Sequence, residues 1–293
     1  MSDAAASQSQ PESTPFVLLL PERIGRAVMS IAGQVGGIGL LAFRLLVRLF
    51  PPRVDRYELV RNLHKMGVLS VGIVSVTALF TGAIMVVQAA PLVLRFNATD
   101  IIGWGAGFAT LREVGPLLIA LMFSGRVGAN NTAELGTMVV TEQLDALRAL
   151  AIDPLAYLIL PRAIAMIVML FVLTVIGDLV AVCGAILSAQ ALLDVDPRQF
   201  MNSFLELISQ WDFMQGLVKS VAFGTMIALT SCHFGMAVTG GAPGVGRAVN
   251  AAVVAAASGI FIMDYFSTFF LRLAPKPTAM TSSEERRVGK ECR

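Results

Sequence analysis

Apolar residues dominate this chain in long runs separated by short polar segments. A helix needs about 20 apolar residues to cross the hydrocarbon core of a membrane, where its backbone polar groups must pair within the helix itself. Five runs are long enough, namely 68–92, 101–123, 163–189, 213–238 and 249–271. The pattern therefore predicts an all-α integral membrane protein with five transmembrane helices.

A sixth run, 27–43, is shorter and rich in glycine. Arg44 and Arg48 follow it at helical spacing, within a continuing apolar stretch. Arginines along one side of such a helix are typical of a helix that lies in the membrane interface, with its guanidinium groups toward the headgroups. We expect an interfacial N-terminal helix here, with a sixth crossing as the alternative.

Composition agrees with a membrane protein. Hydrophobic residues make up 56% of the chain and charged residues only 14%, whereas about 25% are charged in soluble domains. Cys183, Cys232 and Cys292 show no C-x-x-C spacing, so they do not indicate a metal or redox site. The high share of hydrophobic residues and the low share of charged ones exclude a soluble globular domain.

The two ends of the chain differ from its middle. Residues 1–20 begin with a polar stretch rich in Pro, Ser and Gln, which predicts disorder. Residues 276–293 form a charged tail unlike anything before it, and it resembles cloning- or adaptor-derived sequence rather than native protein. The membrane domain is therefore expected within 21–275.

The distribution of Lys and Arg orients the spans, because cytoplasmic connections carry an excess of them. Six basic residues precede the first firm span: Arg44, Arg48, Arg53, Arg56, Arg61 and Lys65. The connection 93–100 holds only Arg95, whereas 124–162 holds three arginines and 190–212 is mainly acidic. This predicts a cytoplasmic N-terminus, a cytoplasmic segment at 124–162 and a C-terminus on the outer side.

The polar segment 124–162 contains a predicted helix over about 132–152. Asn131 followed by Glu134 resembles a capping box, and Asp153-Pro154 is a plausible stop. One face of this helix is apolar, through Leu144, Leu147 and Ala151, and the other is charged, through Glu142, Asp145 and Arg148. Helices that rest on lipid headgroups are normally basic, so this acidic helix indicates a protein partner more than a membrane surface.

A few ionisable residues fall inside the predicted spans. Such a group costs about 2.5–3.5 kcal/mol at the centre of a membrane helix, so it usually has a partner or faces water. The five residues are Arg112, Glu113, Asp178, Lys219 and Asp264. At about 1.5 Å per residue, all but Asp178 reach overlapping depths in the outer half of the membrane. They predict a buried network that either locks helices together or lines the polar part of a lipid cavity. Asp178 either joins this set or faces a water-filled crevice.

Several short motifs recur in a fixed order along the chain. They are LREVGP (111–116), SGRVGA (124–129), AELGTM (133–138), TEQLDAL (141–147), DPLAYLILPR (153–162) and GGAPGVGRAV (240–249). Together they resemble the MlaE/YrbE family of ABC transporter permeases, over roughly 56–271. The resemblance implies an N-terminal elbow helix, five membrane spans and a cytoplasmic coupling helix that docks on an ATPase subunit.

The resemblance also implies partners and a substrate. Permeases of this family work in the bacterial inner membrane as homodimers with two ATPases and an MCE-domain lipid-binding protein, and they move phospholipids or related lipids. No cofactor is implied in this chain, because ATP and Mg²⁺ belong to the ATPase, and nucleic acid has no role. The expected coupling residues are Glu134, Glu142, Gln143, Asp145 and Arg148.

The chain has no motif for nucleotide hydrolysis. A phosphate-binding loop needs G-x-x-x-x-G-K-[ST], and the Gly-rich segment 240–247 lacks both the Lys and the hydroxyl residue. This segment is better interpreted as a tight turn. The alternative function is an ion- or proton-coupled secondary transporter, although the sequence shows no inverted repeat of broken spans.

Overall fold

The computed structural model describes residues 16–48, 56–96 and 101–273, and every regular element in these ranges is a helix. Within these ranges, six helical stretches are long and apolar enough to cross a membrane: 28–48, 56–95, 102–140, 155–193, 210–236 and 241–271. The predicted all-α membrane fold is confirmed. Residues 16–20 of the segment expected to be disordered are helical, whereas residues 1–15 and the tail 276–293 lie outside the described part.

The most extensively packed pair of helices is α2 (Arg56–Arg95) and α7 (Leu160–Leu193), which lie side by side over much of their length. Glycine makes this close approach possible. A Cβ atom on Gly82 would collide with the backbone of Ala181, and one on Gly184 would collide with the backbone of Leu79. Small residues at such crossings let membrane helices meet backbone to backbone.

The second span is longer than its apolar run. It continues without a break through α3 (Ile102–Ala109), η2 (Thr110–Val114), α4 (Gly115–Phe123), η3 (Ser124–Gly128) and α5 (Ala129–Val140), of which η2 and η3 are π-helical turns. The helix predicted to end at residue 123 therefore continues to Val140. The capping box predicted at Asn131 is wrong, because Gly128 before α5 is already helical and no side chain caps it. Asn131 instead points into the bundle, where its amide donates to Ser231 Oγ at 3.0 Å.

The helix expected over 132–152 is divided into two. Its first part belongs to α5, and its second part is the short helix α6 (Gln143–Ala149). Glu142 separates them with a φ of +58°, a left-handed conformation that ends a helix. A short connection and the π-helical turn η4 (Leu155–Ile159) then lead into α7.

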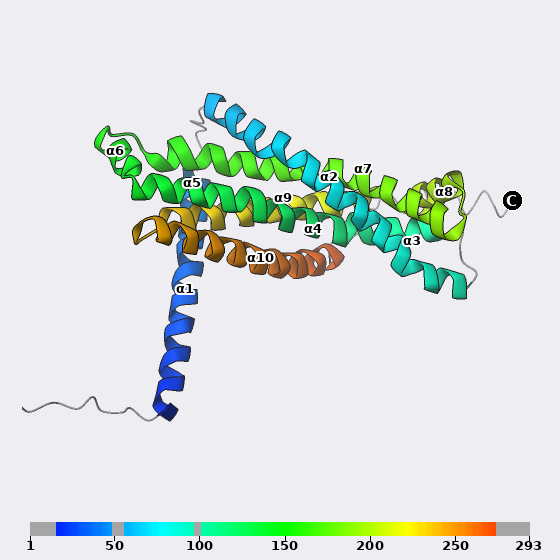
Figure 1. Ribbon diagram of the computed structural model, residues 1–293, viewed down its shortest axis with the longest axis horizontal. Helices are drawn as coiled ribbons and strands as arrows, with labels where there is room; N and C mark the ends of the chain where they lie inside the picture. Colours follow the sequence, from blue (N-terminus) through cyan, green and yellow to red (C-terminus); the bar gives the residue numbers. More distant parts are fainter. Residues whose placement is uncertain (1–15, 49–55, 97–100, 274–293) are drawn as a thin grey trace, which may run out of the picture.

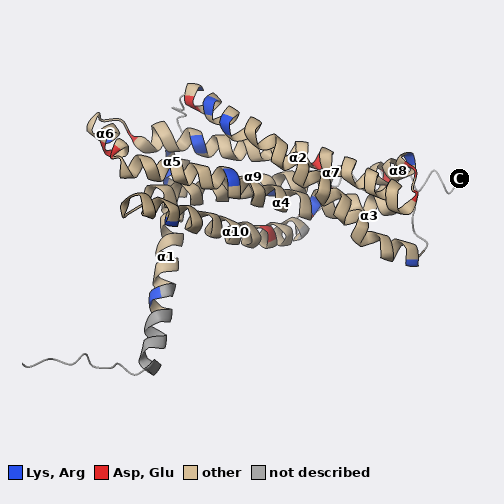
Figure 2. Cartoon of the chain, in the orientation of Figure 1, with Lys and Arg blue, Asp and Glu red and all other residues tan. Residues whose placement is uncertain are grey.

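At the opposite end of the bundle, α8 (Pro197–Leu207) packs on α3. Gly103 and Gly107, whose G-x-x-x-G spacing indicates close helix packing, meet Phe200 and Phe204 of this helix. We refer to the two ends as the α6 end and the α8 end. Figure 2 shows that charged residues gather toward these ends and are sparse along the spans between them.

The last two spans form an antiparallel pair. A capping box at Ser209 and Asp212 starts α9 (Gln210–Met236), which runs to the α6 end. A short turn follows, in which Gly240 and Gly241 have φ values of +85° and +69°, and α10 (Gly241–Leu273) returns beside α9 and α5. The prediction of a tight turn over the whole Gly-rich segment 240–247 is therefore wrong, because the turn ends at Gly240 and residues 241–247 form the first part of α10.

The N-terminal helix α1 (Phe16–Arg48) runs across the bundle rather than along it (Figure 1). It contacts α9 near the α6 end, where Gly37 lies against His233. Arg48 forms an ion pair with Asp153 in the connection after α6. This crosswise direction favours the interfacial elbow over a sixth crossing, although 28–48 is apolar enough to span.

Candidate functional site

An ion-paired network joins three helical segments within the apolar part of the bundle. The ammonium of Lys219 on α9 contacts the carboxylate of Glu113 on η2 and that of Asp264 on α10, with 2.9 Å from Nζ to Asp264 Oδ1. The hydroxyl of Thr268, one turn beyond Asp264, donates to Glu113 Oε2 at 3.3 Å. Of the five intramembrane charges singled out in the sequence, the structure brings Glu113, Lys219 and Asp264 into direct contact.

Arg112 extends the network toward the start of α9. Its Nη1 donates to Asp212 Oδ1 at 3.2 Å, its Nε lies 3.8 Å from Glu113 Oε1, and its guanidinium carbon lies 5.1 Å from the centre of the Phe108 ring. Sequence reasoning missed Asp212 because it placed this residue in an outer connection. Its position seven residues before Lys219 was a usable signal, since such residues share one face of a helix.

A π-helical turn of the backbone positions the side chains of Arg112 and Glu113. Both lie on η2, where the N–H of Gly115 bonds to the carbonyl of Thr110, five residues earlier. Such π-helical turns are rare and frequently occur at functional sites. The wider turn brings two adjacent charged side chains to the same network.

Exposure and charge define what this network can do. The Lys219 side chain is 1% exposed, whereas that of Glu113 is 35% exposed. Two cations meet three carboxylates, so the cluster is net acidic. Lys219 is enclosed by its partners and is out of reach of a lipid phosphate, which leaves Glu113 as the accessible group.

Asp178 does not join the network. It lies on α7, it is buried, and neither carboxyl oxygen has a hydrogen-bond partner within the described ranges. Its Oδ1 lies next to Gly115, where an added Cβ would come within 2.9 Å. The structure therefore separates Asp178 from the other four predicted residues.

A second polar cluster lies nearer the α6 end and contains Glu134, which sequence analysis assigned to the coupling surface. The Glu134 carboxylate contacts Lys65 of α2, accepts from Asn130 Nδ2 at 2.8 Å and lies 3.4 Å from Arg162 Nη1 of α7. Asn131 also accepts from Arg162, at 3.3 Å. Glu134 is thus part of the bundle and not of the surface formed by α6.

The other four coupling candidates lie together at the tip of the bundle. Glu142, Gln143, Asp145 and Arg148 are all exposed on or beside α6, while Leu144 is buried beneath them. Arg148 Nη1 and Asp145 Oδ1 form a surface ion pair at 2.8 Å. Beside them, a hollow of about 320 Å³ is lined mainly by apolar side chains, which include Leu147, Leu150 and Tyr157. An acidic helix beside an apolar hollow is suited to contact with another protein.

The described residues contain no group of three or more His, Cys, Asp or Glu side chains that would suit a metal ion. The interactions that the described site residues make are ion pairs and hydrogen bonds among their own side chains. Such a site can bind and position a ligand.

Comparisons with known proteins agree with this organisation. Residues 59–270 match the family model described as Permease MlaE. A probable ABC transporter permease protein from Synechocystis is 35% identical over 82% of this chain and 91% of its own length. One from Rickettsia felis is 36% identical over 86% and 98%, respectively. The chloroplastic protein TRIGALACTOSYLDIACYLGLYCEROL 1 of Arabidopsis thaliana is 33% identical over 90% of this chain and 74% of its own length.

Proposed function

This chain belongs to the MlaE permease family, and from that premise we propose that it moves phospholipids or related lipids across or between membranes. As an ABC transporter permease it is a multi-pass, non-enzymatic subunit that works with a separate ATPase. Membership in this family also removes the secondary transporter from consideration. The lipid substrate, the orientation and the further partners are parts of the proposal.

The observation that carries the lipid proposal is a partly open ion-paired network among membrane-spanning helices. Glu113 keeps 35% of its side chain exposed while it contacts the enclosed Lys219. Charged groups at such depth usually mark a substrate pathway or a proton relay. The plant relative carries the name of a galactolipid, trigalactosyldiacylglycerol, in its own name, which supports a lipid as the ligand class.

The α6 end is proposed to face the cytoplasm and to dock on the ATPase through Glu142, Gln143, Asp145 and Arg148. The excess of Lys and Arg before the first span supports this orientation, and so do the exposed α6 and its apolar hollow. The α8 end would then face outward, where an MCE-domain protein would receive or deliver lipid. A second copy of the chain would complete the lipid cavity in the inner membrane.

The test is the lipid flux of a reconstituted transporter with Glu113→Gln. This change removes the charge but keeps the shape of the side chain, and it loses charge-assisted hydrogen bonds worth about 1.5–3 kcal/mol each. We expect lipid flux to fall about tenfold or more, while the complex with the ATPase still assembles.

The matched control is Glu206→Gln, because Glu206 is an exposed acid on α8 away from the network. It should leave flux unchanged. Wild-type flux in Glu113→Gln would remove the network from the pathway, and absence of lipid flux in the wild-type complex would refute the proposed substrate.

A further inference from the structure

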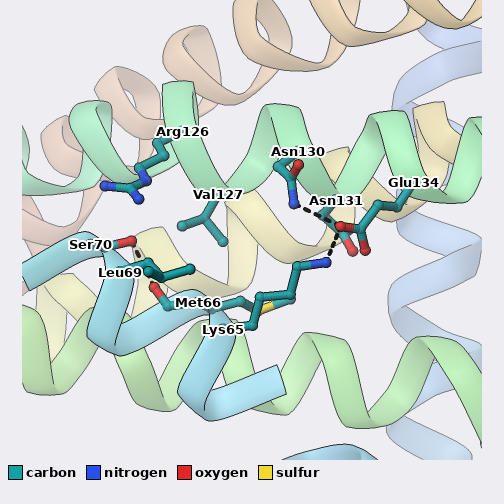
Figure 3. Close-up of a pocket in the computed structure, with 9 residues that line it drawn as sticks. All are labelled: Lys65, Met66, Leu69, Ser70, Arg126, Val127, Asn130, Asn131 and Glu134. Carbon is teal, nitrogen blue, oxygen red and sulfur yellow. Dashed lines mark hydrogen bonds and ion pairs between the residues drawn. The ribbon is translucent and has the colours of Figure 1, made fainter. Parts of the chain in front are cut away.

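The cluster around Glu134 borders a crevice that the proposed lipid pathway does not use. The crevice has a volume of about 300 Å³ and lies between α2 and the η3–α5 segment. Figure 3 shows its lining: Lys65, Met66, Leu69, Ser70, Arg126, Val127, Asn130, Asn131 and Glu134. We propose that this crevice binds the phosphate group of an anionic lipid from the leaflet at the α6 end.

Charge balance is the first argument. Glu134 is already in contact with Lys65 and Arg162, so the cations around the crevice outnumber its carboxylate. Arg126 is exposed and forms no ion pair or hydrogen bond within the part of the chain that the structure describes. In Figure 3 its guanidinium lies at the opposite end of the crevice from the Lys65–Glu134 pair. Arg126 is therefore a free cation, and arginine binds phosphate through paired N–H donors.

The ion-paired network around Lys219 has the opposite charge balance. There, three carboxylates face two cations and the lysine is enclosed. The cations of that network are already paired with carboxylates, so Arg126 of the crevice, unpaired within the described residues, offers the stronger contact to a phosphate. The two clusters therefore differ in whether a cation is free to contact a ligand.

Depth in the membrane is the second argument. Glu113 and Arg126 lie on one continuous helix, thirteen residues apart, which corresponds to about 20 Å. The hydrocarbon core is about 30 Å thick. If Glu113 lies in the outer half, as proposed above, the crevice lies close to the headgroups of the opposite leaflet. This step rests on the proposed orientation.

The walls of the crevice fit an amphipathic ligand. Met66, Leu69 and Val127 supply apolar surface beside the polar residues. Leu69 is 58% exposed, and its exposed neighbour Val68 extends the same apolar surface along α2. An acyl chain can lie on this surface while its phosphate contacts Arg126. A soluble phosphate would gain nothing from these apolar residues.

Backbone geometry adds a third argument. Arg126 lies on η3, the second π-helical turn of this helix, just as Arg112 and Glu113 lie on the first. Such turns often mark functional positions in helices. One continuous helix thus presents charged side chains from two such turns.

The experiment measures lipid retained by the full-length protein in mild detergent, by native mass spectrometry, after incubation with phosphatidylglycerol or phosphatidylcholine. We expect the wild type to retain phosphatidylglycerol in preference to phosphatidylcholine. Arg126→Gln should lower this occupancy about tenfold, as expected for the loss of one charge-assisted contact. The control is Arg247→Gln, an exposed arginine near the same end of the bundle, which should retain the wild-type occupancy.

Two further measurements locate the bound lipid and distinguish it from a soluble anion. A photoreactive phosphatidylglycerol should attach to residues 65–70 or 126–131, and attachment only near Arg112 and Glu113 would overturn the assignment. Excess inorganic phosphate should not displace the lipid, and full displacement by phosphate would indicate a site for a soluble anion. Equal occupancy in wild type and Arg126→Gln, equal loss in Arg247→Gln, or no retained lipid would each refute the proposal. Because the measurement is occupancy rather than flux, these outcomes leave the role of Glu113 to its own test.

Discussion

Lys219 is enclosed by the two carboxylates that it neutralises, so its side chain is tied to two neighbouring helical segments at once. This arrangement fits both hypotheses drawn from the sequence, a lock between helices and the wall of a lipid pathway. The two hypotheses predict different results for a variant in which the charges of Glu113, Lys219 and Asp264 are all removed. A buried ion pair can often be replaced by neutral groups at little cost, whereas loss of one partner alone costs about 3–5 kcal/mol.

We predict that Lys219→Met lowers both the thermal midpoint of the purified protein and its lipid flux, because two carboxylates lose their common partner. Adding Glu113→Gln and Asp264→Asn to the same chain should recover most of the midpoint, since no unpaired charge remains. Flux should stay low in this triple variant if the charges line the pathway. Differential scanning fluorimetry and a reconstituted flux assay measure the two quantities.

Recovery of flux together with the midpoint would make the network a lock only. A triple variant that stays as unstable as Lys219→Met would show that the shape of the side chains, and not their charge, holds the helices. The exposed pair Arg148–Asp145 offers a comparison, because neutralising it should change the midpoint little, as for other surface ion pairs.

Asp178 shows the limit of sequence patterns at this scale. Sequence analysis counted it among the intramembrane charges, but its depth did not decide whether it joins the other four residues. In the structure its carboxylate lies next to Gly115, without a hydrogen-bond partner in the described ranges. Which way a residue faces depends on the neighbours of its helix, and a list of charged positions does not contain that information.

Among the elements, the continuous helix 102–140 organises the molecule. It carries the ion-paired network on η2 and the crevice arginine on η3, and it ends beside α6. A polar stretch directly after an apolar span normally indicates a loop. Here the polar side chains of Asn131, Thr132 and Glu134 find partners on α7, α9 and α2, so the helix continues.

The short helix α6 allows a direct test of the proposed ATPase contact. We predict that Glu142→Lys combined with Asp145→Lys lowers the amount of ATPase that co-purifies with the chain about tenfold. Each change reverses a charge on an exposed position, and like charges across an interface are strongly unfavourable. Lysine keeps an ordinary side chain at the left-handed position 142, so the backbone strain there stays similar.

The control for this change is Glu206→Lys, which reverses an exposed acid on α8. It should leave the ATPase bound. An unaltered complex in the α6 variant, with the protein still monodisperse, would show that the ATPase docks elsewhere.

For the molecule as a whole, the proposed orientation places α6 and α8 on opposite sides of the membrane. We predict that Ala146→Cys on α6 reacts with a membrane-impermeant maleimide only from the cytoplasmic side. Asn202→Cys on α8 should react only from the outer side, because both positions are exposed at opposite ends of the bundle. Inverted and right-side-out vesicles of a variant without native cysteines provide the measurement.

Labelling of both positions from one side would contradict the bundle topology itself. Labelling from the two sides in the reverse order would keep the topology but would place α6 away from the nucleotide pool. In that case neither the ATPase contact nor the leaflet assigned to the crevice would stand.

The hydrophobic pattern by itself determined that the chain is an all-α membrane protein with five principal spans, because hydrocarbon requires runs of about 20 apolar residues. The ordered motifs and the sparse charges inside the spans also indicated the permease family and the Glu113–Lys219–Asp264 network. These features depend on local composition and on rise per residue, both of which a sequence contains.

Only the tertiary structure decided which polar residues are surface and which are interior. Asn131 and Glu134 have the pattern of a helix start on an exposed segment, yet their partners come from α2, α7 and α9, up to a hundred residues away. The same packing enclosed Lys219, separated Asp178 and left Arg126 unpaired within the described residues. A polar side chain finds a hydrogen-bond or ion-pair partner only if folding brings a suitable group close to it. The separation of the two groups along the chain does not reveal whether this happens.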